Sequence, residues 1–196
     1  MAITIEQVKD LRERTGVSIM QCRKALEEAG GDSEKAVIIL RKKSGEAMAK
    51  KADRTFSAGA IASYIHSNTN VGAMVELVSE TDFVAKNDEF LALARDIAMH
   101  ITAANPKFLK KEDITPDVVA KAKEVFEEEV KDKPAAMREK VLEGKLASYF
   151  SDMVLMNQAF IKNPDMTIEG LISQAVQKFG EKIEVARFVR FGVLER

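Results

Sequence analysis

The sequence predicts an α+β fold in which a small helical domain precedes a core of antiparallel strands covered by helices. Helix caps and glycine stops recur at nearly regular intervals over residues 1–45, and the periodicity changes from helical to extended after Gly59. A further β-forming segment follows much later, at residues 182–193. With 46% hydrophobic residues, a chain of 196 residues can bury a core of ordinary size.

Residues 1–45 are predicted to form three short helices. Thr4 and Ser18 are each followed three positions later by a glutamine, which matches the capping box that satisfies backbone N–H groups at a helix start. Asp32 opens the third helix. Glycines supply the conformational freedom that helix ends use, at Gly16, Gly30, Gly31 and Gly45.

The second of these helices separates core residues from an exposed methionine. Four residues fall on one face at helical spacing and are predicted to be core: Ile19, Cys22, Leu26 and Ala29. Met20 rotates away from this stripe toward charged residues, so its side chain is expected in solvent. A solitary exposed methionine is common, and a soft contact for a partner is the alternative; the helix alone leaves both open.

Residues 46–58 form a basic, alanine-rich connector, and the α+β core occupies residues 59–196. A charge run of this kind is more often a solvated surface than a nucleic-acid contact. Within the core, the segments "AIASYIHS" and "VGAMVELVSE" flank "NTN", which predicts a β-hairpin. The third strand, at residues 182–193, is predicted to place Phe188 opposite its other apolar residues: Ile183, Val185, Val189 and Phe191.

The chain between the second and third strands is predicted to be helical. Residues 82–104 read as one long amphipathic helix, and Thr115 followed by Pro116 starts another helix. The pattern breaks at Lys133 and Pro134 and then resumes. The last helix is capped by a threonine and stopped by a glycine, at Thr167 and Gly180.

No catalytic or metal-binding constellation can be assembled from the sequence. Cys22, His66 and His100 show no zinc-ligand spacing, and there is no Gly-rich phosphate loop or nucleophile elbow. A net charge of -1 does not favour a general nucleic-acid binder. There is no apolar run of about 18 residues and no secretory pattern in "MAITIEQVKD". We therefore expect a cytoplasmic binding protein without enzyme activity, cofactor, metal, membrane or direct nucleic-acid contact.

Phe83 in the segment "ELVSETDFVAKNDEF" has two possible roles. On a helical wheel, several apolar residues lie within about 40° of it, which favours a core side chain: Phe90, Ala94, Ile97 and Ile101. A polar turn at Lys86 and Asn87 separates Phe83 from this stripe, which favours a side chain that inserts into a partner. Thr81 as N-cap and Asp82 in the first turn are explained by the helix start alone.

Several segments together carry a resemblance to a known family. They are "LRERTGVSIMQCRKALEEAGGDSEKA" from Leu11, "KKAD" from Lys50, "ETDFVAKNDEF" from Glu80, "AMH" from Ala98 and "RFVRF" from Arg187. Through them the chain resembles the bacterial elongation factor Ts family, in its short form, over nearly all of its length. The resemblance implies that the N-terminal helices form a ubiquitin-associated-like domain.

The same resemblance implies guanine-nucleotide exchange on elongation factor Tu, bound in its GDP and nucleotide-free forms, with no catalytic residue or cofactor. One set of residues matches positions that contact Tu through the N-terminal domain: Leu11, Ile19 and Met20. A second set matches the element that disturbs the Mg²⁺ site of Tu, with the phenylalanine as a wedge: Thr81, Asp82, Phe83 and Val84.

Short members of the family pair two chains, so the resemblance also implies a homodimer. The candidate dimer surfaces are the strand at residues 187–191 and the helices around residues 134–150. A competing hypothesis is a ribosome- or RNA-associated binding module, in which the basic connector contacts phosphate and the N-terminal domain recruits a protein. Phosphate-dominated binding weakens steeply with salt, which separates the two hypotheses.

Overall fold

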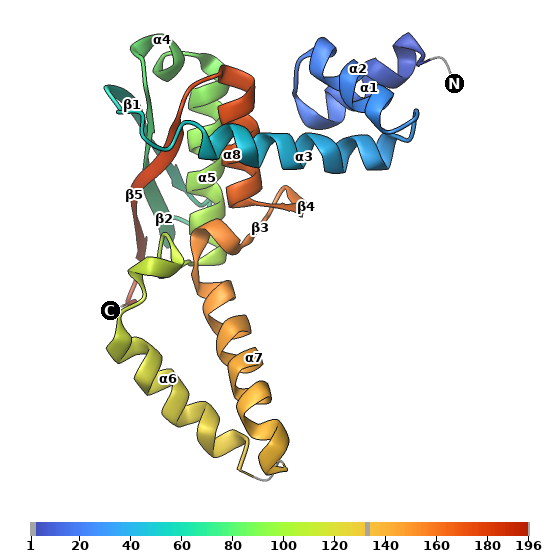
Figure 1. Cartoon of the computed structure of the whole chain (residues 1–196). Coiled ribbons are helices and arrows are strands. Elements are labelled where there is room, and N and C mark those ends of the chain that lie inside the picture. The colour runs from blue at the N-terminus through green and yellow to red at the C-terminus, as the bar shows by residue number, and fades with distance from the viewer. Residues whose placement is uncertain (1–2, 132–133, 196) are drawn as a thin grey trace.

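The computed structural model describes residues 3–131 and 134–195. It confirms the predicted α+β class: an N-terminal helical region lies beside a core in which helices cover a small antiparallel sheet. A long helical hairpin projects from the core, away from the end that carries the N-terminal helices (Figure 1). The molecule is therefore elongated, with the N-terminal helices and the tip of the hairpin at opposite ends.

The N-terminal region folds as predicted into three helices, α1 (Ile5–Thr15), α2 (Ile19–Glu28) and α3 (Ser33–Ala49). Thr4 forms a complete capping box with the glutamine three positions later, while Ser18 and Asp32 accept the backbone N–H three positions ahead. Gly16 ends α1 with a φ of 66°, in the left-handed region that glycine adopts without strain. Local sequence signals thus fix the starts of all three helices.

The predicted stop of the third helix at Gly45 is wrong, because α3 continues to Ala49. A glycine inside a helix costs about 1 kcal/mol relative to alanine, which packing can offset. Here α3 packs against the core helix α8 (Ile168–Phe179). Ser44 is buried between them, donates to the Leu40 carbonyl at 2.9 Å and contacts Gln177 of α8. Tertiary packing therefore extends the helix past its glycine.

The sheet has the order β1-β2-β5, with strands β1 (Ala58–Ile65), β2 (Val71–Ser79) and β5 (Ile183–Gly192). Both pairings are antiparallel, as the hairpin and the late third strand predicted. In the hairpin loop, Thr69 adopts a positive φ of 58° and the Asn68 side chain accepts the Asn70 N–H at 3.0 Å. The Asn-rich loop thus closes the turn through its own side chains.

A β-bulge in β5 corrects the predicted distribution of its side chains. The register shifts between Glu76 and Leu77, which leaves Ala186 without a partner across the sheet. Before the bulge, the residues facing the core are Ile183 and Val185. After it the faces exchange, so Phe188 packs on the core, whereas two apolar residues point to solvent, Val189 and Phe191. The single predicted stripe along this strand is therefore split between two faces.

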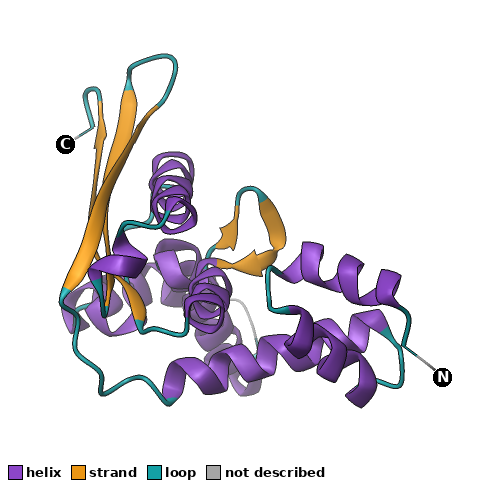
Figure 2. Cartoon of the chain, turned by 90° about the horizontal axis from the view of Figure 1, so that it is seen from above, coloured by secondary structure: helices purple, strands orange, loops and turns teal. Residues whose placement is uncertain are grey.

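The predicted single helix over residues 82–104 is two helices, α4 (Asp82–Ala85) and α5 (Asp88–Ala104). Asn87 separates them because its backbone is extended and its side chain accepts the Glu89 N–H at 2.9 Å, capping α5. Helix α5 packs on β1 and β2 and buries the apolar stripe beginning at Phe90. Figure 2 shows the helices against one face of the sheet, with the other face bare.

The projecting hairpin consists of α6 (Pro116–Glu129) and α7 (Ala135–Met153). Pro134 precedes α7 as predicted, and Lys133 lies outside the described residues. The Phe126 and Tyr149 rings, 5.3 Å apart, join the two helices. A two-stranded sheet that the sequence did not predict follows, β3 (Ala159–Phe160) and β4 (Asn163–Thr167). Helix α8 then begins at the Thr167 cap and ends at Gly180, as predicted.

Candidate partner-binding surfaces

Phe83 lies on α4, a single helical turn between β2 and α5, and its side chain is 81% exposed. The interpretation of Phe83 as a core residue is therefore wrong. A continuous helix would have aligned it with Phe90, which is buried, but the extended backbone at Asn87 ends that alignment. The helix break thus excludes the core role, and insertion into a partner stays a prediction.

The neighbours of Phe83 divide into exposed and buried groups. Thr81 begins the turn and accepts the Val84 N–H on its hydroxyl at 3.5 Å. Asp82 is exposed and pairs with Lys86 at 2.7 Å, and that hydrogen bond lowers the pKa of Asp82. Val84 is only 4% exposed and packs in the main core, so it cannot offer its surface to a partner. The expectation of a direct contact is corrected for Val84, which anchors the turn instead.

Residues distant in the chain hold this turn, and no sequence pattern pointed to them. Glu80 accepts from the Arg54 guanidinium at 3.1 Å and from the backbone N–H of Lys182. Burial disfavours the charged form of Glu80, but these two donors outweigh it and keep the pKa of Glu80 below its ordinary value. Thr81 is held in turn by Glu181, which is 100 residues away in the chain. No local pattern links such positions.

The start of α2 presents the second exposed apolar pair. Met20 is 83% exposed, as its rotation away from the core stripe predicted. Ile19 is 56% exposed, so its assignment to that stripe is wrong, because it occupies the first position of the helix, at the edge of the domain. Together the two residues form the α2 patch, defined as Ile19 and Met20.

Leu11 supports the N-terminal domain from within. Its side chain is 0% exposed and packs with Val17 and Leu26 in the small core of the three helices. A side chain without accessible surface cannot contact a partner directly, which corrects that expectation. Cys22 belongs to the same core, and burial raises the pKa of its thiol.

Helix α4 and the N-terminal helices both lie at the end of the molecule opposite the tip of the α6–α7 hairpin (Figure 1). The residues assigned to partner contact from the sequence, Phe83 and the α2 patch, are thus exposed on two separate elements at that end.

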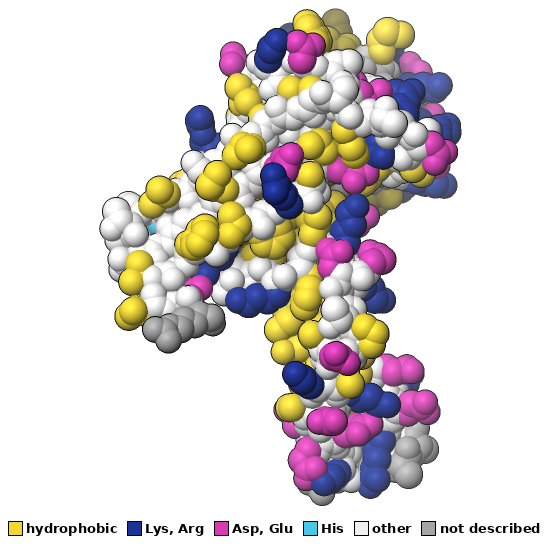
Figure 3. Space-filling model, turned by 90° about the vertical axis from the view of Figure 1, so that its left-hand side faces the viewer, with side chains coloured by type: hydrophobic (Ala, Val, Ile, Leu, Met, Phe, Trp, Pro, Cys, Tyr) yellow, Lys and Arg dark blue, Asp and Glu magenta, His cyan; other side chains and the backbone are white. Residues whose placement is uncertain are grey.

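The bare face of the three-stranded sheet is apolar. Figure 3 looks onto this face and shows hydrophobic side chains gathered over the sheet. The exposed apolar residues are Ile61, Ile65, Met74, Val189, Phe191 and Val193, which we call the sheet patch. Arg187 and Glu76 pair at 2.6 Å on neighbouring strands beside it. Exposed apolar surface of this extent is typical of an interaction site.

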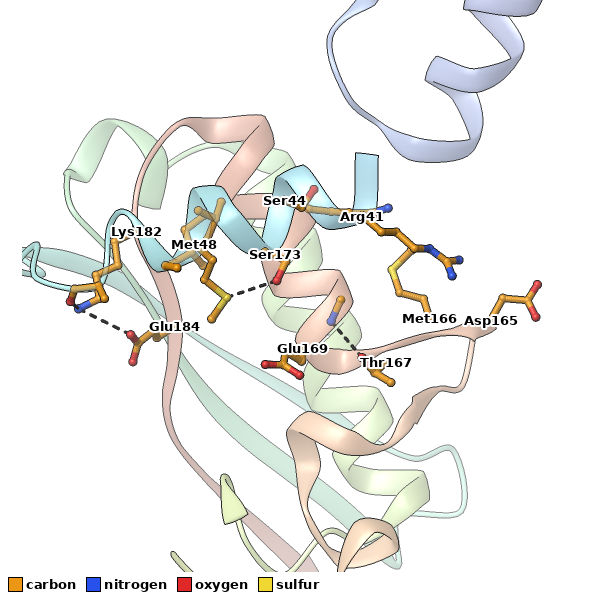
Figure 4. A pocket seen from close by; sticks show the side chains of 17 residues that line it. Arg41, Ser44, Met48, Asp165, Met166, Thr167, Glu169, Ser173, Lys182 and Glu184 are labelled. Atoms are coloured by element: carbon orange, nitrogen blue, oxygen red, sulfur yellow. Dashed lines mark hydrogen bonds and ion pairs between the residues drawn. The ribbon is translucent and has the colours of Figure 1, made fainter. Parts of the chain in front are cut away.

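A groove of about 580 Å³ lies between α3 and α8 (Figure 4). Ser173 donates to the Met48 sulfur at 3.3 Å inside it, and Lys182 pairs with Glu184 at 3.6 Å at one end. The contact between Ser173 and Met48 joins α3 to the core. The labelled side chains do not bring a nucleophile together with a base. We therefore interpret the groove as the packing interface between α3 and the core.

The buried histidine of the core is held in one protonation state. His100 is completely buried, its Nε2 lies 2.9 Å from the Gln158 side-chain oxygen, and its Nδ1 accepts the Ile161 N–H at 3.4 Å. Burial lowers the pKa of His100, and the Gln158 hydrogen bond opposes this only in part. A neutral imidazole that joins α5 to the β3 region has a structural role.

Within residues 3–131 and 134–195, no group of three or more His, Cys, Asp or Glu side chains could hold a metal ion. Among the helices of the same residues, none is long and apolar enough to cross a membrane. The surfaces that stand out are instead exposed apolar side chains on anchored elements, which are typical of the class of proteins that act by contacting other proteins.

Comparison with known proteins identifies the family. Residues 5–195 match the family model described as Elongation factor TS. The chain is 51% identical over 194 residues to Elongation factor Ts of Thermodesulfovibrio yellowstonii, covering 98% of this chain and 97% of the relative. It is 48% identical over 197 residues to that of Fervidobacterium nodosum, with 100% of both chains covered. The protein therefore belongs to the elongation factor Ts family.

Proposed function

We propose that this protein is a guanine-nucleotide exchange factor for elongation factor Tu. It binds GDP-bound Tu, promotes GDP release by disturbing the Mg²⁺ and phosphate site, and stays on nucleotide-free Tu until GTP binds. It does this in the cytoplasm, without a cofactor and without catalysing a chemical reaction. Membership of the elongation factor Ts family supports this proposal.

Phe83 is the observation that carries the mechanism. A large apolar side chain that is 81% exposed on a turn anchored by buried Val84 is already ordered for insertion into a partner. Mg²⁺ and the nucleotide phosphates hold one another in Tu, so displacing the loops around them weakens both. Phe83 enters between side chains of Tu, while Thr81 and Asp82 lie exposed beside it.

The α2 patch supplies the second contact with Tu. Met20 offers a flexible apolar side chain that adapts to an irregular surface. Binding at the N-terminal domain holds Phe83 close to its target. Because linkage is reciprocal, the factor and the nucleotide weaken each other's binding equally, and incoming GTP therefore expels the factor.

Release of a fluorescent GDP analogue from Tu tests this proposal with the variant Phe83→Ala. At saturating factor we expect the maximal release rate to fall by about tenfold or more, since central aromatic contacts dominate such interfaces. The melting temperature should stay unchanged because Phe83 is exposed. An unchanged release rate would contradict the wedge.

Ile38→Ala is the matched control, because it also removes a large exposed apolar side chain. Ile38 is 65% exposed and lies on α3, outside the proposed Tu contacts and the sheet patch. This variant should keep the maximal release rate within about twofold. A loss as large as that of Phe83→Ala would indicate a nonspecific effect of surface truncation.

A homodimer formed through the sheet patch, with α7 as a further contact, is part of this proposal. A sheet with one bare apolar face buries it by packing on a second sheet about 10 Å away. Light scattering should give twice the chain mass for the wild type and a single chain mass for Phe191→Asp. A dimer that survives this charge in the sheet patch would refute this choice of surface.

The RNA-binding alternative has less structural support. Arg54 of the connector is paired with Glu80 of the core, so part of the connector's positive charge is used within the chain. Binding to Tu through apolar contacts should change little between about 50 and 200 mM salt, whereas phosphate-dominated binding falls by orders of magnitude. Steep salt dependence would favour the alternative.

A further inference from the structure

Thr81 caps α4 and also forms two hydrogen bonds with a residue distant in the chain. Its hydroxyl accepts the Val84 N–H, which begins α4. The same hydroxyl donates to one carboxylate oxygen of Glu181 at 2.6 Å, and its backbone N–H donates to the other at 3.0 Å. Glu181 therefore grips the cap of α4 with both oxygens, at the residue from which the turn carrying Phe83 begins.

Glu181 is itself held by the geometry of the chain around it. It follows Gly180, whose φ of 74° ends α8, and precedes β5, which is paired with β2. The next residue, Lys182, donates its backbone N–H to Glu80 and its ammonium to the Ala52 carbonyl at 2.5 Å. This short segment thus ties α8, the connector and the start of α4 together.

The two hydrogen bonds from Thr81 to Glu181 constrain the direction of α4 more than they raise the stability of the fold. The carboxylate is a charged acceptor, and such hydrogen bonds are shorter and stronger than neutral ones. Because this contact is at the surface, water can replace much of its energy when it breaks. Water cannot replace the constraint on the backbone of Thr81, whose φ of -129° and ψ of 157° set how α4 leaves the sheet.

We infer that Glu181 is a positioning residue for Phe83: by holding both Thr81 donors, it fixes the direction in which α4 presents the phenylalanine to its partner. This inference rests on the proposed exchange function. A pre-ordered turn loses less conformational entropy on binding, so the clamp lowers the concentration of factor that half-saturates Tu. The maximal rate depends on the wedge itself and is unaffected by the clamp.

Exchange kinetics against factor concentration test the inference in the full chain. Glu181→Ala should raise the half-saturating concentration about five- to tenfold, with the maximal release rate within about twofold of wild type. Glu181→Gln keeps one acceptor oxygen. Its half-saturating concentration should lie between those of wild type and Glu181→Ala, about two- to threefold above wild type. Glu169→Ala is the control: it removes a glutamate that is exposed in the first turn of α8, and should leave both parameters unchanged.

Amide hydrogen exchange of the free protein provides a readout that needs no Tu. The Thr81 and Val84 amides should exchange faster in Glu181→Ala than in wild type, and at the wild-type rate in Glu169→Ala. Unchanged amide exchange would overturn the clamp. Faster amide exchange with an unchanged half-saturating concentration would overturn its role in positioning.

The variant Phe83→Ala separates failure of this inference from failure of the proposed function. If Phe83→Ala leaves nucleotide release unchanged, the exchange mechanism and the positioning role are both refuted, and the amide data then test only the clamp. If Phe83→Ala abolishes release while Glu181→Ala alters neither kinetic parameter, the mechanism stands and the positioning role of Glu181 is refuted.

Discussion

The starts of α2 and α4 resemble each other but are held by different kinds of contact. Each begins at a hydroxyl cap and exposes a large apolar residue in its first turn, Met20 in α2 and Phe83 in α4. Ser18 caps α2 through its neighbour Gln21 alone, whereas Thr81 also depends on Glu181. The orientation of Met20 is therefore a local property of the sequence, and that of Phe83 is a property of the fold.

The largest expected effect comes from removing the support beneath the α2 patch. Leu11→Ala leaves a cavity in the small N-terminal core and should cost about 3 kcal/mol or more of local stability. Hydrogen exchange should accelerate across α1 to α3, while the amides of α4 and α5 keep their wild-type rates. Equal acceleration in both regions would show that the two are one cooperative unit.

Met20→Glu tests the patch without disturbing its support. Placing a charge in an apolar contact should weaken binding to Tu about tenfold, measured by titration calorimetry. Melting temperature should be unchanged because Met20 is 83% exposed. Glu27→Ala, a change on an exposed residue of the same helix, is the control and should bind as wild type. Unfolding of the N-terminal region in Met20→Glu would contradict the exposed placement of Met20.

Lowering the pH from about 7 to about 5 should reduce the stability of the core but not that of the N-terminal region. The folded-state pKa of His100 is lowered by burial, so below about pH 6.5 the unfolded chain takes up a proton that the folded chain resists. Stability is therefore complete above that pH and is lost as pH falls toward the folded pKa, with a slope of at most about 1.4 kcal/mol per pH unit.

Denaturant unfolding between pH 7 and pH 5 measures this loss. Amide protection factors, corrected for the slower intrinsic exchange at lower pH, should fall in α5 over the same range but not in α1 to α3, which contain no histidine. His100→Gln should be less stable at pH 7 and have a flatter pH dependence. The same slope in both proteins would exclude His100 as its source.

The smallest effect should follow loss of the local cap. Ser18→Ala removes the acceptor of the Gln21 N–H and should cost about 1 kcal/mol, with faster amide exchange only in the first turn of α2. Ser18→Thr keeps the hydroxyl and is the control. A change in the amide rates of α4 would contradict the local character of this helix start.

Local signals predicted most of the elements because they act over a few residues. The caps at Thr4, Ser18 and Asp32, the hairpin and the third strand all depend on hydrogen bonds or alternation within a short segment. Two predictions failed for different reasons. The stop at Gly45 failed because α3 packs on the distant helix α8, whereas the uninterrupted helix over residues 82–104 failed because the local cap at Asn87 was missed.

Predictions for the candidate site also divide into those that local signals supported and those that depended on the folded structure. The sequence identified Met20 as exposed from its position on the wheel, but it could not decide Phe83 or foresee the burial of Leu11 and Val84. Glu181 escaped notice because a glutamate after a helix stop is an ordinary residue in a sequence. Its significance comes only from the approach of Thr81.

The sequence by itself determined the α+β class, the helix starts, the hairpin and the family to which the chain belongs. Tertiary structure alone decided that α3 continues through Gly45, that β5 exchanges faces at Ala186, and that Phe83 points to solvent while Val84 is buried. The physical reason is the distance along the chain over which each interaction acts. Capping and periodicity act within a few residues, whereas burial and clamping depend on which distant segments fold against them.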